Sequence, residues 1–386
     1  MGSLSIETGE ANGWQAVAMC CRAGYRHGVA KPPTIYDVAE AAGVAPSTVS
    51  RAFSRPGRVN SETAQRIRDV ATQLGYRTNP LARGLSTART MTIGLVIADI
   101  TNPVYSEIMR GAQVAAADAG YTMLLADTQG SDRVERESIE RAMPAVEGIV
   151  LASSRMSDSA IRMTAKQKPL VVLNRAVVDV PSVVTDNARG ARRAAEHLGG
   201  LGHEVITYVA GPEASWADGM RWRALREVEL ELGLKVRRIG PFPPTVQGGV
   251  RAAHELSKHP TSAVIAYNDQ LAIGMMRGLA SMGVRVPEDV SVVGFDNIFG
   301  SDLVTPGLTT VAAPLRVQGT TAVKNLLALV GGASSTTGKA VVLPTRLVVR
   351  ASTAQRSRKR TAPTWGTTTV SGPASKLARR TSAGAR

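Results

Sequence analysis

Short apolar runs alternate with amphipathic helical patterns along residues 91–351, and this alternation is the strongest constraint that the sequence places on the fold. Alternating strands and helices form parallel sheets with helices on both faces. About ten strands over this stretch predict an α/β body of two doubly wound parallel-sheet subdomains. Seven runs have the length and composition of strands: TIGLVIA (92–98), TMLLAD (122–127), GIVLAS (148–153), PLVVLN (169–174), VITYVAG (205–211), SAVIAYND (262–269) and SVVGFD (291–296).

Polar residues follow or end most of these runs. Parallel strands bring their carboxyl ends to one edge of a sheet, and ligands bind in the crevice beyond that edge. We therefore expect a site for a small polar ligand among the polar residues at these strand ends: Asp99, Asp127, Ser153, Asn174, Asn268, Asp269 and Asp296.

Three short helical patterns precede the body, over residues 33–78. Thr34 and Asp37 have the spacing of a capping box, and Gly43 stops the helix that they begin. Pro46 suits the first position of a second helix, PSTVSRAFS. Two short helices joined by a turn that contains glycine predict a helix-turn-helix. A third helix over residues 61–74 is expected to close the core with Ile67, Val70, Ala71 and Leu74.

The second helix of such a module places its N-terminal part in the major groove of DNA. Arginine can donate two hydrogen bonds to a guanine edge, and serine can bond to bases or phosphates. The exposed positions of this helix are Pro46, Ser47, Ser50 and Arg51. On pattern alone, the alternative is a small helical bundle with a solvated arginine.

The net charge of +15 is concentrated at the two ends of the chain. Residues 352–386 carry eight Lys or Arg and no acidic residue, and residues 31–89 carry nine against four. Such basic ends favour an anionic partner, usually nucleic acid. Composition predicts a flexible extension over residues 1–32 and a basic disordered tail over residues 352–386.

Several classes of protein and site are not expected. The adjacent Cys20 and Cys21 suit neither a structural disulfide nor a metal site, so we expect a reducing cytoplasmic location and no metal or cofactor. No signal peptide or membrane span is recognisable. The motifs GxSxG and GxxxxGK are absent, and no histidine lies beside a nucleophile in a recognisable motif, so an enzyme is not expected.

The sequence resembles the lac repressor (LacI/GalR) family over roughly residues 33–350. The resemblance is carried by TIYDVAEAAGVAPSTVSRAF (34–53) and GYRTNPLARGL (75–85), and continues through GPEASWADGMRWRAL, NDQLAIGMMRGL and VPEDVSVVGFDN. It implies a dimer or dimer of dimers and a body like that of periplasmic sugar-binding proteins. It also divides the chain into a helix-turn-helix domain (33–78), a hinge helix and linker (79–90) and an effector-binding and dimerisation domain (91–351).

The resemblance also implies how the hinge meets DNA. A helix as short as the one expected here, with Gly84 inside it, is marginal alone, so we expect it to form when two copies pack on DNA. Leu85 would enter the minor groove as an apolar wedge that kinks the duplex, with Ala82 and Arg83 lining the groove. The alternative is a linker leucine that packs on the body. Residues implied to hold phosphates are Thr34, Tyr36, Thr48, Thr63, Tyr76 and Asn79.

In the body, the resemblance implies that Arg221 grips a sugar hydroxyl or a carboxylate of the effector. The other implied effector contacts are Val104, Tyr105, Ile108, Ser153, Asn174, Asn268 and Asp296. The sequence departs from the family pattern at Ala45, where a capping serine is usual, and at Ala313, where glutamine is common. Residues 241–246 replace a segment that often presents an aromatic ring, so Phe242 is an open candidate.

These features together predict a sequence-specific DNA-binding transcriptional regulator, expected to be a repressor, that is controlled by a small ligand. The expected partners are a near-palindromic operator and a sugar or sugar derivative. A purine-type corepressor is the alternative ligand. A solute-binding protein and an enzyme are the competing classes, and both are disfavoured.

Overall fold

The structure is a computed structural model that describes residues 33–54, 57–76, 89–333 and 339–356. The chain divides into two compact units, Met1–Arg89 and Thr90–Arg386. The sequence-predicted extension and most of the basic tail lie outside the described residues, as do four predicted DNA contacts: Asn79, Ala82, Arg83 and Leu85.

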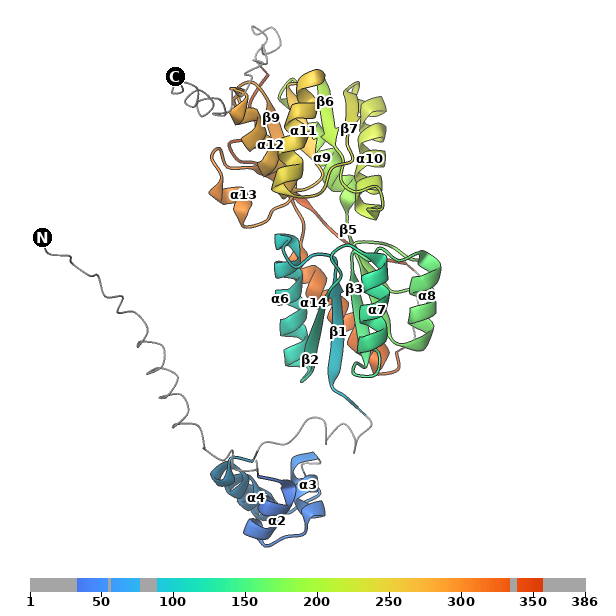
Figure 1. The fold of residues 1–386 in the computed structure, drawn as a ribbon, viewed down its shortest axis with the longest axis vertical. Helices are drawn as coiled ribbons and strands as arrows, with labels where there is room; N and C mark the ends of the chain where they lie inside the picture. The colour runs from blue at the N-terminus through green and yellow to red at the C-terminus, as the bar shows by residue number, and fades with distance from the viewer. Residues whose placement is uncertain (1–32, 55–56, 77–88, 334–338, 357–386) are drawn as a thin grey trace, which may run out of the picture. The chain divides into compact units, whose positions relative to one another are not determined.

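Three helices form the first unit: α2 (Ile35–Ala42), α3 (Pro46–Ser54) and α4 (Ser61–Leu74), shown in Figure 1. The predicted capping box is present, since Asp37 Oδ2 accepts hydrogen bonds from the Thr34 N–H at 2.6 Å and the Thr34 hydroxyl at 2.8 Å. Gly43 and Gly75 end α2 and α4 with φ angles of 64° and 69°, which glycine adopts without a steric penalty.

Small and branched apolar side chains make up the core of this unit. The prediction that Leu74 closes the core is wrong, because its side chain is 41% exposed. Leu74 is the last residue of α4, and the chain turns at Gly75 so that Tyr76, and not Leu74, packs against the core. The buried core residues are Val38, Ala39, Ala42, Val49, Ala52, Ala64, Ile67 and Ala71.

The second unit consists of two lobes, each built on a six-stranded sheet. The first lobe has the strand order β11-β5-β4-β3-β1-β2. Helices α6 and α14 pack on one face of its sheet and α7 and α8 on the other. Its elements are β1 (Thr92–Ile97), α6 (Pro103–Asp118), β2 (Thr122–Asp127), α7 (Asp132–Ala142), β3 (Gly148–Ala152), α8 (Asp158–Gln167), β4 (Leu170–Leu173), β5 (Ser182–Thr185), α14 (Leu315–Val330) and β11 (Val341–Leu343).

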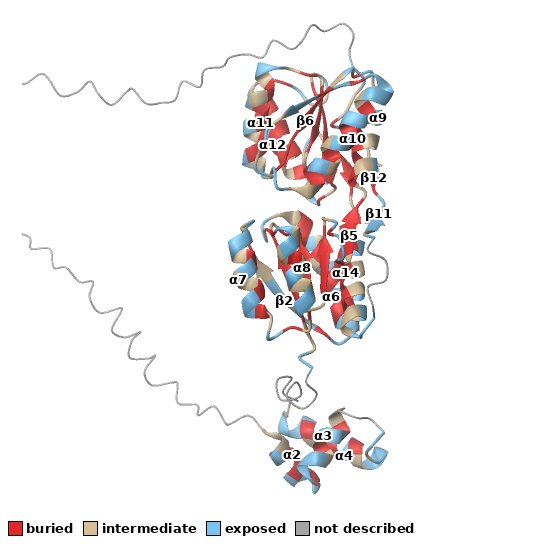
Figure 2. Ribbon diagram, turned by 90° about the vertical axis from the view of Figure 1, so that its right-hand side faces the viewer, coloured by how far each residue is buried: buried red, intermediate tan, exposed pale blue. Residues whose placement is uncertain are grey.

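The second lobe has the strand order β12-β10-β9-β8-β6-β7. Helices α9 and α10 cover one face of this sheet and α11 and α12 the other. Figure 2 shows the buried sheets between helices whose outer faces are exposed. The elements are α9 (Asn187–Gly200), β6 (Val205–Val209), α10 (Trp216–Leu232), β7 (Lys235–Ile239), α11 (Val246–Lys258), β8 (Ala263–Ala266), α12 (Asp269–Ser281), β9 (Ser291–Asp296), α13 (Gly300–Leu303), β10 (Thr309–Ala312) and β12 (Arg346–Val348).

The predicted class of two doubly wound parallel-sheet subdomains is confirmed, with one addition. All strand pairs are parallel except β10 with β12, which is antiparallel. The chain passes between the lobes three times: from β5 to α9, from β10 to α14, and from β11 to β12. The first lobe is therefore completed by α14 and β11, from near the end of the described chain.

Two glycines allow α6 and α14 to approach closely in the first lobe. A Cβ atom on Gly319 would lie 2.0 Å from the carbonyl oxygen of Ile108, and one on Gly111 would lie 2.0 Å from that of Arg316. Any larger residue would have to push the backbones of the two helices apart. Because α6 begins beside the cavity described below, this contact also positions part of the cavity wall.

No helix among the described residues is both long and apolar enough to cross a membrane. Within the same ranges, no group of three or more His, Cys, Asp or Glu side chains is placed to hold a metal ion.

Candidate functional site

The first candidate site is the exposed face of α3. Val49 and Ala52 are buried in the helical core, so the opposite side of α3 is left for solvent. That side carries Pro46, Ser47, Ser50 and Arg51, as the sequence predicts for a helix that enters a DNA groove.

The phosphate contacts implied by resemblance lie at several points around this unit. Thr34 lies at the N-cap of α2, and Tyr36 is 70% exposed in its first turn. Thr48 and Thr63 are half-buried in the first turns of α3 and α4. Tyr76 follows α4 and packs on Phe53 with ring centroids 6.1 Å apart. Positions at helix N-termini suit anionic oxygens, because backbone N–H groups point toward them.

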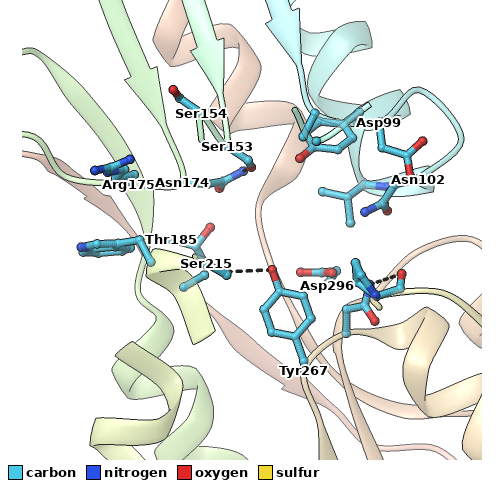
Figure 3. Close-up of a pocket in the computed structure, with 18 of the residues that line it drawn as sticks. Asp99, Asn102, Ser153, Ser154, Asn174, Arg175, Thr185, Ser215, Tyr267 and Asp296 are labelled. Carbon is cyan, nitrogen blue, oxygen red and sulfur yellow. Dashed lines mark hydrogen bonds between the residues drawn. The ribbon is translucent and has the colours of Figure 1, made fainter. Parts of the chain in front are cut away.

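The second candidate site is a cavity of about 190 Å³ between the two lobes of the second unit (Figure 3). This volume is below the roughly 300–1,000 Å³ that is typical of pockets for drug-sized ligands. Seven of the eight predicted effector contacts line the cavity: Val104, Tyr105, Ser153, Asn174, Arg221, Asn268 and Asp296. The eighth, Ile108, is fully buried in the core of the first lobe and does not line it.

Arg221, on α10, is the most heavily bonded side chain of the lining. Its Nε donates to Asn187 Oδ1 at 2.9 Å, and its Nη1 donates to the carbonyl oxygen of Tyr267. Its guanidinium carbon lies 3.5 Å from the centre of the Phe295 ring. With 6% of its surface exposed, Arg221 is a buried cation held in one orientation.

Asp296 is the counterpart of Arg221, and its side chain makes no hydrogen bond to other described residues. Its Oδ1 lies 3.8 Å from Arg221 Nη2, which is beyond hydrogen-bond distance. It ends β9 with a φ angle of 109°, a strained conformation for a residue with a side chain, and strain of this kind is concentrated at functional sites. The carboxyl group therefore lines the cavity with only a long ion pair to Arg221 and with its hydrogen-bonding capacity available to a ligand (Figure 3).

On the first lobe, a chain of polar side chains forms the wall. The Tyr105 hydroxyl is hydrogen-bonded to the Ser153 side chain, and burial raises the pKa of Tyr105 well above its usual value. Asn174 Nδ2 donates to Ser153 Oγ at 3.0 Å. Gln318, fully buried on α14, donates to Asn174 Oδ1 at 2.6 Å. Tyr105 and Asn174 are thus held by Ser153, after β3, and by Gln318, on α14.

Asn268 has a structural role as well as a place in the lining. Its Oδ1 accepts from the Leu271 N–H at 2.9 Å at the start of α12, and its Nδ2 donates to the carbonyl oxygen of Pro244 at 3.3 Å. Asp269, expected at the same sheet edge, is fully buried and does not line the cavity. It accepts hydrogen bonds from Ser301 and Thr310 instead.

Two other residues that the sequence suggested for the site, Asp127 and Phe242, do not line the cavity. Asp127 is absent from the lining and accepts a hydrogen bond from the Gln129 N–H. Phe242 packs against the core under α11 and α12.

Ala313, where the family pattern favours glutamine, lines the cavity as the resemblance leads us to expect. Several other residues of the lining were not expected from the sequence. Tyr267 precedes Asn268 and bonds through its hydroxyl to Ser215 Oγ at 3.0 Å (Figure 3). The strand-end rule could have found Thr185, which ends β5, and Asn187, which follows shortly after it. Other members that were not expected are Asn102, Gln129, Arg155, Arg175 and Trp216.

The carboxyl group of Asp296 makes the ligand-free cavity sensitive to pH. Burial raises its pKa to about 8, the nearby charge of Arg221 opposes this shift, and the charge of Asp269 adds to it. Arg221 does not overcome the cost of burial, because two of its donors are already bonded to Asn187 and Tyr267.

We expect a rise in pH to destabilise the wild-type protein relative to Asp296→Asn. The pKa of the folded state lies above the unfolded value of about 4, so the folded state holds the proton more tightly. That contribution to stability is complete below about pH 4 and is lost as the pH rises through about 8. Urea denaturation between about pH 5 and 8 should show the wild type losing about 1 kcal/mol per pH unit relative to Asp296→Asn.

The exposed Asp118 on α6 provides the matched control, since Asp118→Asn should follow the wild-type pH profile. If Asp296→Asn follows that profile too, the carboxyl group of Asp296 is not protonated in the folded protein at neutral pH.

Comparison with known proteins identifies the family of both units. Residues 34–79 match the family described as bacterial regulatory proteins, lacI family, and residues 195–353 match the periplasmic binding protein-like domain. The transcriptional regulator DegA of Bacillus subtilis is 32% identical over 330 residues, which cover 83% of this chain and 98% of DegA. The transcriptional repressor CytR of Escherichia coli K12 is also 32% identical, over 83% of this chain and 96% of CytR.

Solved structures show the same similarity. The lac repressor dimer bound to operator and the anti-inducer ONPF superposes with a TM-score of 0.76 at 26% identity, covering 84% of this chain and all of that one. A LacI family regulator of Enterococcus faecalis V583 with bound ribose superposes with a TM-score of 0.63 at 32% identity, covering 69% of this chain and all of that one. With a helix-turn-helix unit and a two-lobed ligand-binding unit in one chain, the protein belongs to the LacI family of ligand-controlled, DNA-binding transcriptional regulators.

Proposed function

We propose that this protein is a repressor that binds a near-palindromic operator as a homodimer and is released by a small sugar or sugar derivative. The observation that carries the proposal is the cavity between the lobes, where Asp296 makes no hydrogen bond to other described residues and Arg221 is a fixed donor. Hydroxyl groups can both donate to the carboxylate and accept from the guanidinium. The ribose in the related Enterococcus faecalis structure and the operator in the lac repressor structure support the same assignment.

Exposed apolar side chains on the second unit support the proposed dimer. Leu124 and Leu125 are exposed on the edge strand β2, and Phe299 and Leu303 are each more than 70% exposed around α13. A second copy of the chain that packs on these side chains would remove them from water.

The proposed control is a change in the closure of the two lobes. A ligand that bridges Arg221 and Asp296 to the side chains of the first lobe favours the closed arrangement of the body. Closure about the three connecting segments changes the spacing of the two linkers in the dimer and so alters the expected hinge helix at residues 79–90. A difference of a few kcal/mol in ligand affinity between two states is sufficient to shift operator occupancy. A location in the cytoplasm on the nucleoid goes with this function.

Selection of binding sites from a random DNA pool by the purified full-length protein tests the proposal. We expect an enriched near-palindrome with a flexible central step, and we expect the binding to weaken when the effector is added. A pool in which no sequence is enriched, with or without candidate sugars and purines, would contradict the proposal of a specific regulator.

Replacing Leu85 by alanine is expected to reduce the preference for operator over random DNA by about tenfold or more, since a wedge that kinks the duplex contributes only at sites that bend readily. The ligand affinity of the second unit should stay unchanged. Binding titrations with operator and scrambled duplexes measure the ratio. Leu230→Ala, which alters an exposed leucine on α10, is the control and should leave the preference intact. An unchanged preference in Leu85→Ala would exclude the wedge role.

A further inference from the structure

The loop after β3 forms one wall of the cavity and is fixed from both sides. Glu135 on α7 is only 2% exposed, and its Oε2 accepts a hydrogen bond from the Arg155 N–H at 2.8 Å. Arg175, after β4, donates to the carbonyl oxygen of Met156 at 2.7 Å. The Met156 N–H is bonded to Ser154 Oγ at 3.2 Å. The main chain of residues 153–156 is therefore held rigidly at the edge of the cavity.

This rigid loop presents Arg155, which lines the cavity. Among the described residues its side chain makes no hydrogen bond and no ion pair, whereas the other two arginines of the lining are bonded. Arg175 forms an ion pair with Asp158, and Arg221 is committed to Asn187 and Tyr267. Burial raises the pKa of Glu135. Its carboxylate accepts a hydrogen bond from the main-chain N–H of Arg155, whereas the Arg155 guanidinium interacts with it only through its charge.

Arg155 and Asp296 belong to opposite lobes, and both line the cavity together with Tyr105. The buried Tyr105 is bonded to Ser153 and feels the charges of both Arg155 and Asp296. A ligand that occupies the space beside Tyr105 therefore meets a cation on the first lobe and a carboxyl group on the second. The cavity of about 190 Å³ has room for a small ligand, and both Arg155 and Asp296 line it.

The balance of charge in the cavity favours an anion. With a pKa of about 8, Asp296 is mainly protonated at neutral pH and does not neutralise Arg221. Asp99, the other carboxylate of the lining, is bound at its own loop by the N–H and the hydroxyl of Thr101. The positive charge of Arg155 and Arg221 is therefore greater than the negative charge of the carboxylates around them. An anionic ligand would supply the negative charge that balances it.

We propose that the cavity takes a monosaccharide-sized polyol with one anionic group, a carboxylate or a phosphate, which Arg155 binds while the hydroxyls bond to Asp296. The inference rests on the proposed control by a sugar-like ligand and narrows its chemical class. The planar guanidinium of arginine can donate two parallel hydrogen bonds to either anionic group.

Calorimetric titration of the full-length protein with matched ligands tests this class. The probes are glucose, gluconate, glucuronate, glucose 6-phosphate and inorganic phosphate. At least one acidic sugar should bind about tenfold or more tightly than glucose, as expected for a charge-assisted hydrogen bond. Gluconate or glucuronate as the tightest ligand identifies a carboxylate, and glucose 6-phosphate identifies a phosphate. Glucose binding as tightly as every acid overturns the inference and leaves the proposed function standing.

Arg155→Gln separates the role of the arginine from the general charge of the protein. This variant should bind the acidic sugar about 10- to 100-fold more weakly and glucose within about twofold of the wild type. Arg141→Gln, on the outer side of α7, keeps the same net charge and should bind like the wild type. Equal affinity of Arg155→Gln and Arg141→Gln for the acid overturns the inference. Absence of binding by every probe contradicts both this inference and the sugar proposal, whereas the selected operator would remain.

Discussion

Replacing Gly319 by alanine is expected to lower the free energy of unfolding of the second unit by about 3 kcal/mol. The added Cβ would lie 2.0 Å from the carbonyl oxygen of Ile108, and the atom in the way is backbone, which cannot rotate aside. Helices α6 and α14 would have to separate, and their separation would loosen the core that both share with the sheet. Urea denaturation followed by circular dichroism measures the change.

Gly219→Ala is the matched control for this substitution. Gly219 is exposed on α10, and a Cβ added there meets no atom within 4 Å. The control should therefore be more stable than the wild type by about 0.5–1 kcal/mol, because alanine favours a helix more than glycine does. A Gly319→Ala protein as stable as this control would show that α6 and α14 can move apart at little cost.

Replacing Arg221 by methionine is expected to abolish the response to ligand, with affinity at least about 100-fold lower. Two contributions act together, because the guanidinium would no longer reach the ligand and the groups around it would lose their partners. Asn187 Oδ1 would be buried without a donor, and Asp296 would lose its nearest positive charge. Removing one partner of a buried ion pair lowers the free energy of unfolding by about 3–5 kcal/mol in comparable cases.

The experiment measures ligand affinity by calorimetry and stability by urea denaturation in the same preparations. Methionine keeps much of the apolar stem, so loss of stacking on Phe295 is limited. Arg223→Met, two residues along α10 on its exposed side, removes the same charge and should alter neither quantity by more than about twofold or 0.5 kcal/mol. Ligand control that survives in Arg221→Met would contradict the assignment of Arg221 to the ligand.

Six of the seven strands predicted from sequence are buried along most of their length, and the seventh, β2, is an exposed edge strand. The buried strands β5 and β10 were missed. Runs such as GIVLAS and SVVGFD are continuous and apolar because helices cover both sides of the sheet. β7 was missed, since its sequence KVRRI places charged residues on an edge strand, where they deter pairing with other chains. The strands β11 and β12 have three residues each and are defined by distant partners, so no local pattern marks them.

The site residues that could be predicted are those that end strands and those that the family resemblance implies. Asn174 and Asp296 end strands, and parallel pairing brings them to one edge. Arg155 carries no such signal, because an arginine in a loop is usually solvated. Its place in the cavity depends on Glu135, twenty residues earlier on another helix. Ile108 has a spacing that fits both the cavity lip and the core, and the close contact with α14 places it in the core.

The three passages of the chain between the lobes have a consequence for synthesis on the ribosome. β1 to β5 are made early, but α14 and β11, which cover and extend their sheet, are made after the entire second lobe. Until then the apolar face of α6 lacks the helix that buries it, so the nascent first lobe exposes a surface prone to aggregation. A premature stop before residue 315 would leave the second lobe nearly complete, but the first lobe would lack α14 and β11. Neither lobe is therefore encoded by one continuous stretch of the gene that could be exchanged as a unit.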